Sequence, residues 1–133
     1  MATLYVARSA KLGKWAADVG LGKHIYKVGV TDEPVKELVA AGWAGETDWQ
    51  LVKQQAAEIT EADALERLAK KQKAVDPRYY PRIREAAGIF KVDPVHVENH
   101  MLLTRALAGE ASATAIKLKP ADFAAYLIHN ALR

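Results

Sequence analysis

The sequence predicts an α/β domain of the α+β type, in which a small three-stranded antiparallel sheet is flanked by helices. Two short apolar stretches that each contain a tyrosine, LYVARS at 4–9 and IYKVGVTD at 25–32, have the side-chain alternation of strands. A third such stretch, WQLVKQ, begins at Trp49. Segments with apolar residues three and four positions apart follow the second and third stretches, as amphipathic helices require. The short connections predict one domain over residues 1–133.

The first strand is expected over residues 3–8, where the apolar residues Leu4 and Val6 occupy alternate positions. This alternation is typical of a strand with one buried face. The next segment, 11–24, contains three glycines and several charged residues. Its composition predicts a loop with at most one helical turn.

The second strand is expected over residues 25–31 and the third over 48–54. Successive side chains of a strand point to opposite faces of the sheet, so Tyr26 and Lys27 lie on opposite faces. One face of the second strand is predicted to carry Tyr26, Val28 and Val30, and the other Ile25, Lys27, Gly29 and Thr31.

A helix is predicted over residues 34–41. Thr31 or Asp32 is a suitable cap, Pro34 fits the first turn, and Gly42 is a typical end. The next helix is expected over residues 61–75, because Thr60 and Asp63 resemble a capping box.

The C-terminal part is predicted to be mostly helical. A short strand, IFKV, is expected after Gly88. A helix then begins at Asp93-Pro94 and ends near Gly109. A last amphipathic helix begins at Pro120 and is expected to bury Phe123, Leu127 and Ala131.

Composition and charge limit the classes of protein to which this chain can belong. The chain has no cysteine, which excludes disulfides and thiolate zinc sites. No apolar run reaches membrane-spanning length and the N-terminus lacks a signal-like segment, so we expect a cytoplasmic protein without a membrane partner. Residues 1–69 hold eight basic and ten acidic residues, whereas residues 70–133 hold eleven and six. The second half is therefore expected to face an anionic partner.

The segment 70–84 carries the most concentrated basic signal in the chain. It contains six basic residues and one acidic residue, with two tyrosines between them. Cations neutralise phosphates and aromatic rings stack on exposed bases, so the segment is predicted to bind nucleic acid. The alternative is a solvated helix end, whose lysines complement the helix dipole. The predicted contact residues are Lys70, Lys71, Lys73, Arg78, Tyr79, Tyr80, Arg82 and Arg84.

Two motifs resemble those of the GIY-YIG nuclease superfamily, namely LYV at 4–6 and YKVGVTDEP at 26–34. They are most similar to the branch whose second motif is YKIG. The order of elements is also similar, since a helix, a third strand and a glutamate-bearing helix follow. The resemblance covers residues 3–92, and 93–133 form a C-terminal helical extension without a counterpart. It implies a divalent-metal-dependent endonuclease that cleaves phosphodiester bonds, with DNA as the expected partner.

The resemblance also implies roles for single residues. Tyr5 matches the tyrosine of the first motif, and Lys27 stands where the stricter family has its second tyrosine. The position of the family's helix arginine is held by Glu37, and the nearest basic residue is Lys36. Glu66 matches the metal-binding glutamate. The implied catalytic residues are thus Tyr5, Lys27 and Lys36, and the implied ligand of Mg²⁺ or another divalent cation is Glu66.

This chemistry has a physical basis. A bound cation and a fixed basic side chain stabilise the charge that builds on phosphate oxygens in the transition state. The tyrosine hydroxyl of the family helps to orient or activate the attacking water. Because an unperturbed tyrosine has a pKa near ~10, it needs a cationic neighbour to act as a base at neutral pH. Lys27, on the same face as Tyr5, is the expected neighbour.

Simpler interpretations exist for each of these residues. Tyr5 can be a packing residue and Lys27 a solvated one. Glu66 can form an ordinary surface pair with Lys70 one turn later. If the catalytic residues are eroded, the same scaffold is a non-catalytic module that binds nucleic acid or protein.

Overall fold

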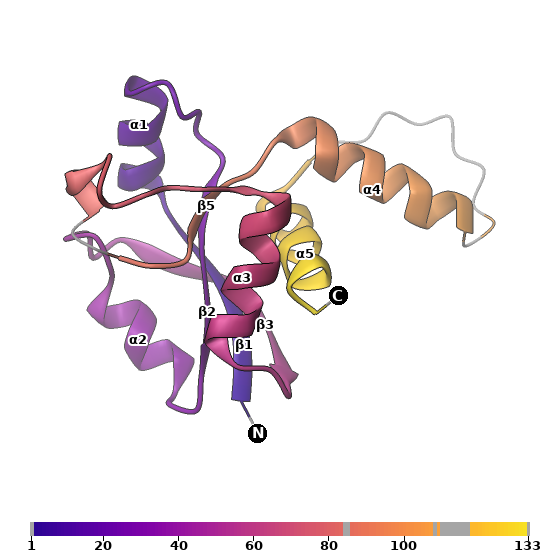
Figure 1. Cartoon of the computed structure of the whole chain (residues 1–133), viewed down its shortest axis with the longest axis horizontal. Coiled ribbons are helices and arrows are strands. Elements are labelled where there is room, and N and C mark those ends of the chain that lie inside the picture. The colour runs from indigo at the N-terminus through magenta and orange to yellow at the C-terminus, as the bar shows by residue number, and fades with distance from the viewer. Residues whose placement is uncertain (1, 84–85, 108, 110–117, 133) are drawn as a thin grey trace.

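The computed structural model describes residues 2–83, 86–107, 109 and 118–132. Within these ranges, five strands form one antiparallel sheet, and five α-helices surround it (Figure 1). The α+β class is therefore confirmed, but the predicted number of three strands is wrong. The strands lie in the order β3-β1-β2-β5-β4, and their bounds are β1 Ala2–Ser9, β2 Ile25–Thr31, β3 Trp49–Ala57, β4 Lys73–Ala74 and β5 Ile89–Lys91.

The two additional strands extend the sheet beyond β2. β5 pairs with β2 over Ile25–Lys27, and β4 pairs with β5. The residues of β4 were expected to belong to the helix over 61–75, yet α3 comprises only Glu61–Lys71. The chain becomes extended at Gln72, and the amide of Val75 donates to the carbonyl of Ile89 at 2.8 Å. Pairing with β5 and burial of Val75 therefore end the helix early.

Helices cover both faces of the sheet (Figure 1). One layer contains α1, Ala10–Asp18, and α2, Val35–Ala41; the other contains α3 and α5, Pro120–Ala131. As a result, β1 is buried on both faces rather than on one. Leu4 and Val6 pack towards α3 and α5, and Tyr5 and Ala7 towards α1 and α2. The faces predicted for β2 are confirmed, with Tyr26 and Val28 opposite Ile25.

The helix α1 replaces the first part of the loop predicted over 11–24, whereas 19–24 form a loop as expected. The hydroxyl of Ser9 accepts from the amide of Leu12 at 3.1 Å and donates to the Asp48 carboxylate, so Ser9 caps α1. Leu12 and Ala16 lie one turn apart and are fully buried, and their burial stabilises the helix despite its glycine. The predicted cap of α2 is also wrong, because α2 has no side-chain cap and Thr31 belongs to β2.

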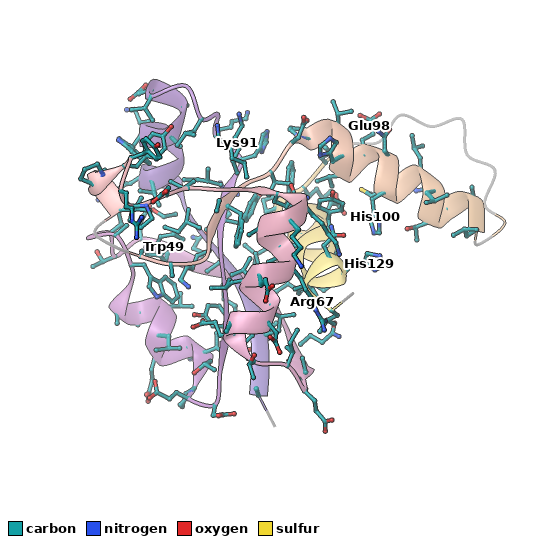
Figure 2. All side chains as sticks on the ribbon, in the orientation of Figure 1. Trp49, Arg67, Lys91, Glu98, His100 and His129 are labelled. Carbon is teal, nitrogen blue, oxygen red and sulfur yellow. The ribbon has the colours of Figure 1, made fainter. Side chains whose placement is uncertain are left out.

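The C-terminal helices confirm the sequence expectation. α4, Pro94–Leu107, projects from the body of the protein, whereas α5 buries Phe123, Leu127 and Ala131. Figure 2 shows His100 of α4 and His129 of α5 near each other, with ring centroids 4.7 Å apart. No helix in the described ranges is long and apolar enough to cross a membrane.

Candidate functional site

The absence of a side chain at Gly29 of β2 leaves the space in which the site around Tyr5 forms. Tyr5 pairs with Gly29 across the sheet. A Cβ at Gly29 would overlap the Tyr5 hydroxyl and lie 2.8 Å from Oε1 of Glu61. Glycine at this position therefore allows the hydroxyl and the carboxylate to approach the same part of the backbone.

Lys27 lies beside Tyr5 on the same face, as the alternation of β2 predicts. Its side chain is buried, with 5% exposure, so the solvated interpretation is wrong. The Nζ atom donates to the carbonyl of Val28 at 3.1 Å and lies 5.8 Å from the Tyr5 ring centroid and 5.3 Å from that of Trp43. The two rings are stacked. Lys27 is thus held by cation–π contacts and one hydrogen bond instead of a close ion pair.

Glu61, which the sequence reasoning did not select, supplies the carboxylate of this site. It begins α3, and its Oε1 accepts from the amide of Val30 at 3.2 Å. The Thr60 cap marks the start of α3 in the sequence, but the contact of Glu61 with β2 joins residues 31 positions apart and has no local signal. Glu66 lies five residues later, which places it about 140° around the helix from Glu61.

The other two residues that the resemblance implies do not join Tyr5. Glu66 forms an ion pair with Lys70 at 3.7 Å, and their side chains are 67% and 73% exposed. This is the surface pair that the simpler interpretation describes. Lys36 is exposed on α2, and no ion pair or side-chain hydrogen bond among the described residues joins it to Tyr5, Lys27 or Glu61.

The electrostatics of the site differ from the expected activation of tyrosine by lysine. Burial, and secondarily the charge of Glu61, raise the pKa of Tyr5 to about 12. Burial lowers the pKa of Lys27, and Glu61 opposes that shift. Tyr5 therefore keeps its proton at neutral pH and is suited to donate a hydrogen bond, not to act as a base.

A cleft of about 690 Å³ opens beside Tyr5 and Glu61. Asp32 and Glu33, which follow β2, line the same cleft. Its walls are completed by Ala2, Val30, Thr31, Leu38, Ile59 and Thr60. Lys27 does not line the cleft, but its Nζ lies 5.8 Å from the ring centroid of Tyr5, which does.

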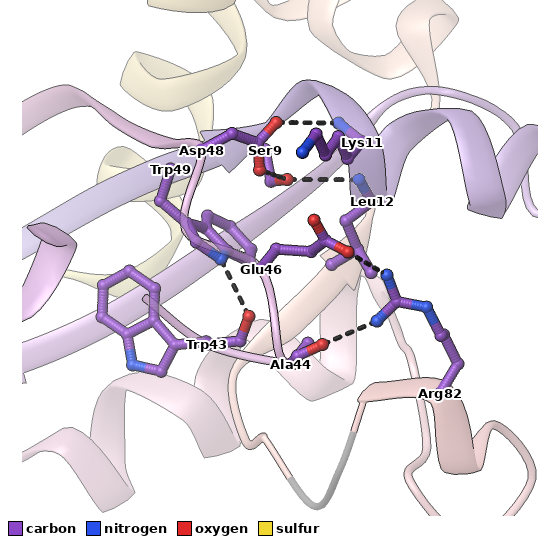
Figure 3. A network of polar contacts seen from close by, with 9 residues as sticks. All are labelled: Ser9, Lys11, Leu12, Trp43, Ala44, Glu46, Asp48, Trp49 and Arg82. Carbon is purple, nitrogen blue, oxygen red and sulfur yellow. Dashed lines mark hydrogen bonds and ion pairs between the residues drawn. The ribbon is translucent and has the colours of Figure 1, made fainter. Parts of the chain in front are cut away.

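The basic segment 70–84 divides into engaged and available residues. Arg82 donates to the carbonyl of Ala44 at 2.6 Å and forms an ion pair with Glu46 (Figure 3). Lys71 donates to the carbonyl of Asn130. Lys73 and Arg78 are exposed and remain available to bind a ligand. Arg84 lies outside the described residues.

The two tyrosines of this segment have different surroundings. Tyr80 packs edge-on against Trp15, with ring centroids 5.8 Å apart. Tyr79 is 80% exposed and is the more suitable of the two for stacking on a base. A hollow of about 440 Å³ beside it is lined by Lys73, Ala74, Asp76 and Tyr80.

Comparison of the chain with protein-family models, curated proteins and solved structures finds no match in any of the three.

Tyr5→Phe is expected to reduce the loss of stability at alkaline pH. The raised pKa of Tyr5 gives a contribution that is fully present below the unfolded-state pKa and is lost as pH rises to about 12. With an unfolded pKa of ~10, this loss is about 1.4 kcal/mol at pH 11. Urea unfolding at pH 8 and pH 11 measures it, with Tyr79→Phe as the exposed control. An unchanged alkaline loss in Tyr5→Phe would contradict the burial of the hydroxyl.

Arg82→Ala is expected to lower the free energy of unfolding by about 1.5–3 kcal/mol, because it removes charge-assisted hydrogen bonds to Ala44 and Glu46. Arg78→Ala should change it by less than about 0.5 kcal/mol, since that side chain is exposed. Chemical unfolding at pH 7 measures both. Equal effects of the two substitutions would show that Arg82 does not hold the 43–46 loop.

Proposed function

We propose that this chain is a nucleic-acid-binding domain on a GIY-YIG-like scaffold. The observation that carries the proposal is the exposed ring of Tyr79 next to two available cations, Lys73 and Arg78. An aromatic ring that is exposed to this extent does not contribute to the core. Beside basic side chains it offers both parts of a single-strand site, namely a stacking surface and positive charge for the backbone.

The turn that presents Tyr79 is preorganised. The carboxylate of Asp76 accepts from the backbone amide of Arg78 at 2.8 Å, and the carbonyl of Asp76 accepts from the amides of Tyr79 and Tyr80. Asp76 is therefore engaged by backbone donors and does not pair with the Arg78 guanidinium in the described part of the chain. The cationic side chain remains free to reach a phosphate.

The charge of this surface supports a nucleic-acid partner over a protein partner. Lys73, Arg78 and the neighbouring Lys70 are exposed along one continuous segment, and only Lys70 has an acidic partner among the described residues. DNA is the expected partner, bound where its bases are unpaired and can stack on Tyr79.

Binding to a fluorescent single-stranded oligonucleotide tests this surface. Two or three phosphate contacts predict a slope of log K against log salt of roughly −1.5 to −2 on a single strand. Arg78→Ala should reduce the magnitude of this slope by about 0.7. Tyr79→Ala should weaken binding by about 1–3 kcal/mol without changing the slope.

Arg105→Ala is the matched control for Arg78→Ala, because Arg105 lies near the distal end of α4. It should leave the affinity and the slope close to those of the unmodified protein. An affinity that is unaffected by Tyr79→Ala and Arg78→Ala would return the segment to the interpretation of a solvated surface.

A second candidate function is metal-dependent cleavage of the bound strand at the Tyr5 cleft. It is favoured by the approach of Tyr5 and Glu61 to Gly29. The Nζ atom of Lys27 lies 5.8 Å from the ring centroid of Tyr5. Tyr5 would donate to a phosphate oxygen, and the positive charge of Lys27 would stabilise negative charge beside it. The alternative, a non-catalytic module, shares the scaffold and the Tyr79 surface.

The donor set restricts which residue would hold Mg²⁺. Glu66 does not fit, because it is paired with Lys70 on the outer face of α3. No cluster of three or more metal-ligating side chains occurs among the described residues. Glu61 fits a one-carboxylate site in a cleft that Asp32 and Glu33 also line, since Mg²⁺ accepts few carboxylates and retains water. Such an ion would polarise the phosphate oxygens.

Plasmid cleavage with and without magnesium separates the two candidates. Glu61→Gln keeps an oxygen for the Val30 amide but removes the charge, and it should reduce cleavage by at least about tenfold. Glu66→Gln is the matched control and should cleave like the unmodified protein. Cleavage lost in Glu66→Gln alone would restore the sequence-based metal ligand. No cleavage by the unmodified protein, with intact binding, would establish the non-catalytic module.

A further inference from the structure

A second cavity lies at the opposite end of β1 from the Tyr5 cleft. β1 enters that cleft at Ala2 and reaches the second cavity at Arg8 and Ser9. Because a strand rises about 3.3 Å per residue, Arg8 lies roughly 20 Å from Ala2 and roughly 10 Å from Tyr5 along β1. The second cavity has a volume of about 400 Å³.

The charged residues that line this cavity are all basic. Arg8 comes from β1, Lys14 from α1, and Lys23 from the turn before β2. None of the three forms an ion pair with another described residue. Three basic residues from separate elements thus line one partly open cavity whose lining contains no carboxylate.

Two acidic residues near the cavity are held by hydrogen bonds to other groups and, within the described ranges, pair with none of the three cations. Asp122, in the first turn of α5, accepts from the amide of Lys119 at 2.8 Å. Asp48 accepts from the Ser9 hydroxyl and from the amide of Lys11 at 3.0 Å, so it is bound at the N-terminus of α1. The backbone amides of Lys11 and Leu12 at the start of α1 therefore already donate to side chains of this chain. The groups that can attract an anion to the cavity are therefore the side chains of Arg8, Lys14 and Lys23, not the N-terminus of α1.

Aromatic rings form one wall of the cavity. His24 stacks on Phe123 with ring centroids 4.6 Å apart, and Tyr26 stacks on the same ring at 5.4 Å. Burial, followed by the charges of Lys23 and Arg8, lowers the pKa of His24. Lys23 and Arg8 therefore both lie close enough to His24 to disfavour its charge, and the imidazole adds a hydrogen-bonding group to the cavity.

We propose that this cavity binds the phosphate monoester of a ligand about the size of a mononucleotide. A phosphate monoester carries a charge of about −1.5 to −2 at neutral pH and three acceptor oxygens. Arg8 can bind two of these oxygens as a fork, with Lys14 and Lys23 as point charges. The volume suits a small ligand, and the aromatic wall suits a base or sugar next to the phosphate.

Binding of adenosine 5′-monophosphate, with adenosine as the unphosphorylated control, tests the proposal. NMR titration of the His24 imidazole localises the ligand, and calorimetry gives Kd. We expect saturable binding of the monophosphate that shifts His24, and at least tenfold weaker binding of adenosine. Arg8→Gln and Lys23→Gln should each raise Kd about tenfold or more. Lys23 is exposed, so Lys23→Gln reports on binding even where Arg8→Gln perturbs β1.

Arg105→Gln is the matched control for Arg8→Gln and should leave Kd unchanged. Equal binding of adenosine and its monophosphate, or no saturable binding, would overturn the proposal. A Kd for Lys23→Gln that equals the Kd for Arg105→Gln would overturn it as well.

Oligonucleotides with and without a 5′-phosphate identify the source of the phosphate. If the strand end is the ligand, the 5′-phosphate should tighten binding in the unmodified protein and have no effect in Arg8→Gln. If a small molecule is the ligand, the monophosphate should bind while the 5′-phosphate leaves oligonucleotide binding unchanged. Both results support a monoester site, and the monophosphate titration involves neither Tyr79 nor Glu61.

Discussion

The antiparallel pairing of β1 with β2, buried between two helical layers, is the constraint on which the rest of the structure depends. Because both faces of β1 are covered, its alternate side chains must fit two separate cores, and a shift of one residue would exchange them. The observed register places Tyr5 opposite Gly29. That single pairing provides the space in which the Tyr5 hydroxyl and the Glu61 carboxylate both approach Gly29.

The same arrangement accounts for the unusual environment of Lys27. Its position on β2 directs the side chain into the core beside Tyr5 and Trp43, where burial disfavours its charge. The aromatic faces and the more distant Glu61 offset part of this cost. A lysine buried in a core at such a cost is more informative about function than an exposed one, because packing alone would favour an apolar residue. The Tyr79 surface and the Arg8 cavity lie elsewhere and do not require this charge.

Local patterns in the sequence predicted the parts of the fold that depend on local physics. The alternation of apolar side chains identified β1 and β2. It also placed Tyr5 and Lys27 on one face of the sheet and Tyr26 on the other. The Thr60 cap identified the start of α3. Features that depend on tertiary contacts were missed. The glycines of 11–24 concealed α1, whose cap relies on Asp48, 39 residues from Ser9. Nor could the sequence show that Arg82 is held by a distant loop, or that Glu61 and not Glu66 faces β2.

The titration of the Lys27 ammonium tests most directly whether Tyr5, Lys27 and Glu61 converge in the folded protein. Side-chain NMR of labelled lysine can follow this group in the unmodified protein and in two matched variants. We expect that the pKa of Lys27 lies below the ordinary lysine value, that Glu61→Gln lowers this pKa further, and that Glu66→Gln leaves it unchanged. An ordinary pKa for Lys27 that does not respond to Glu61→Gln would contradict the convergence of the three side chains.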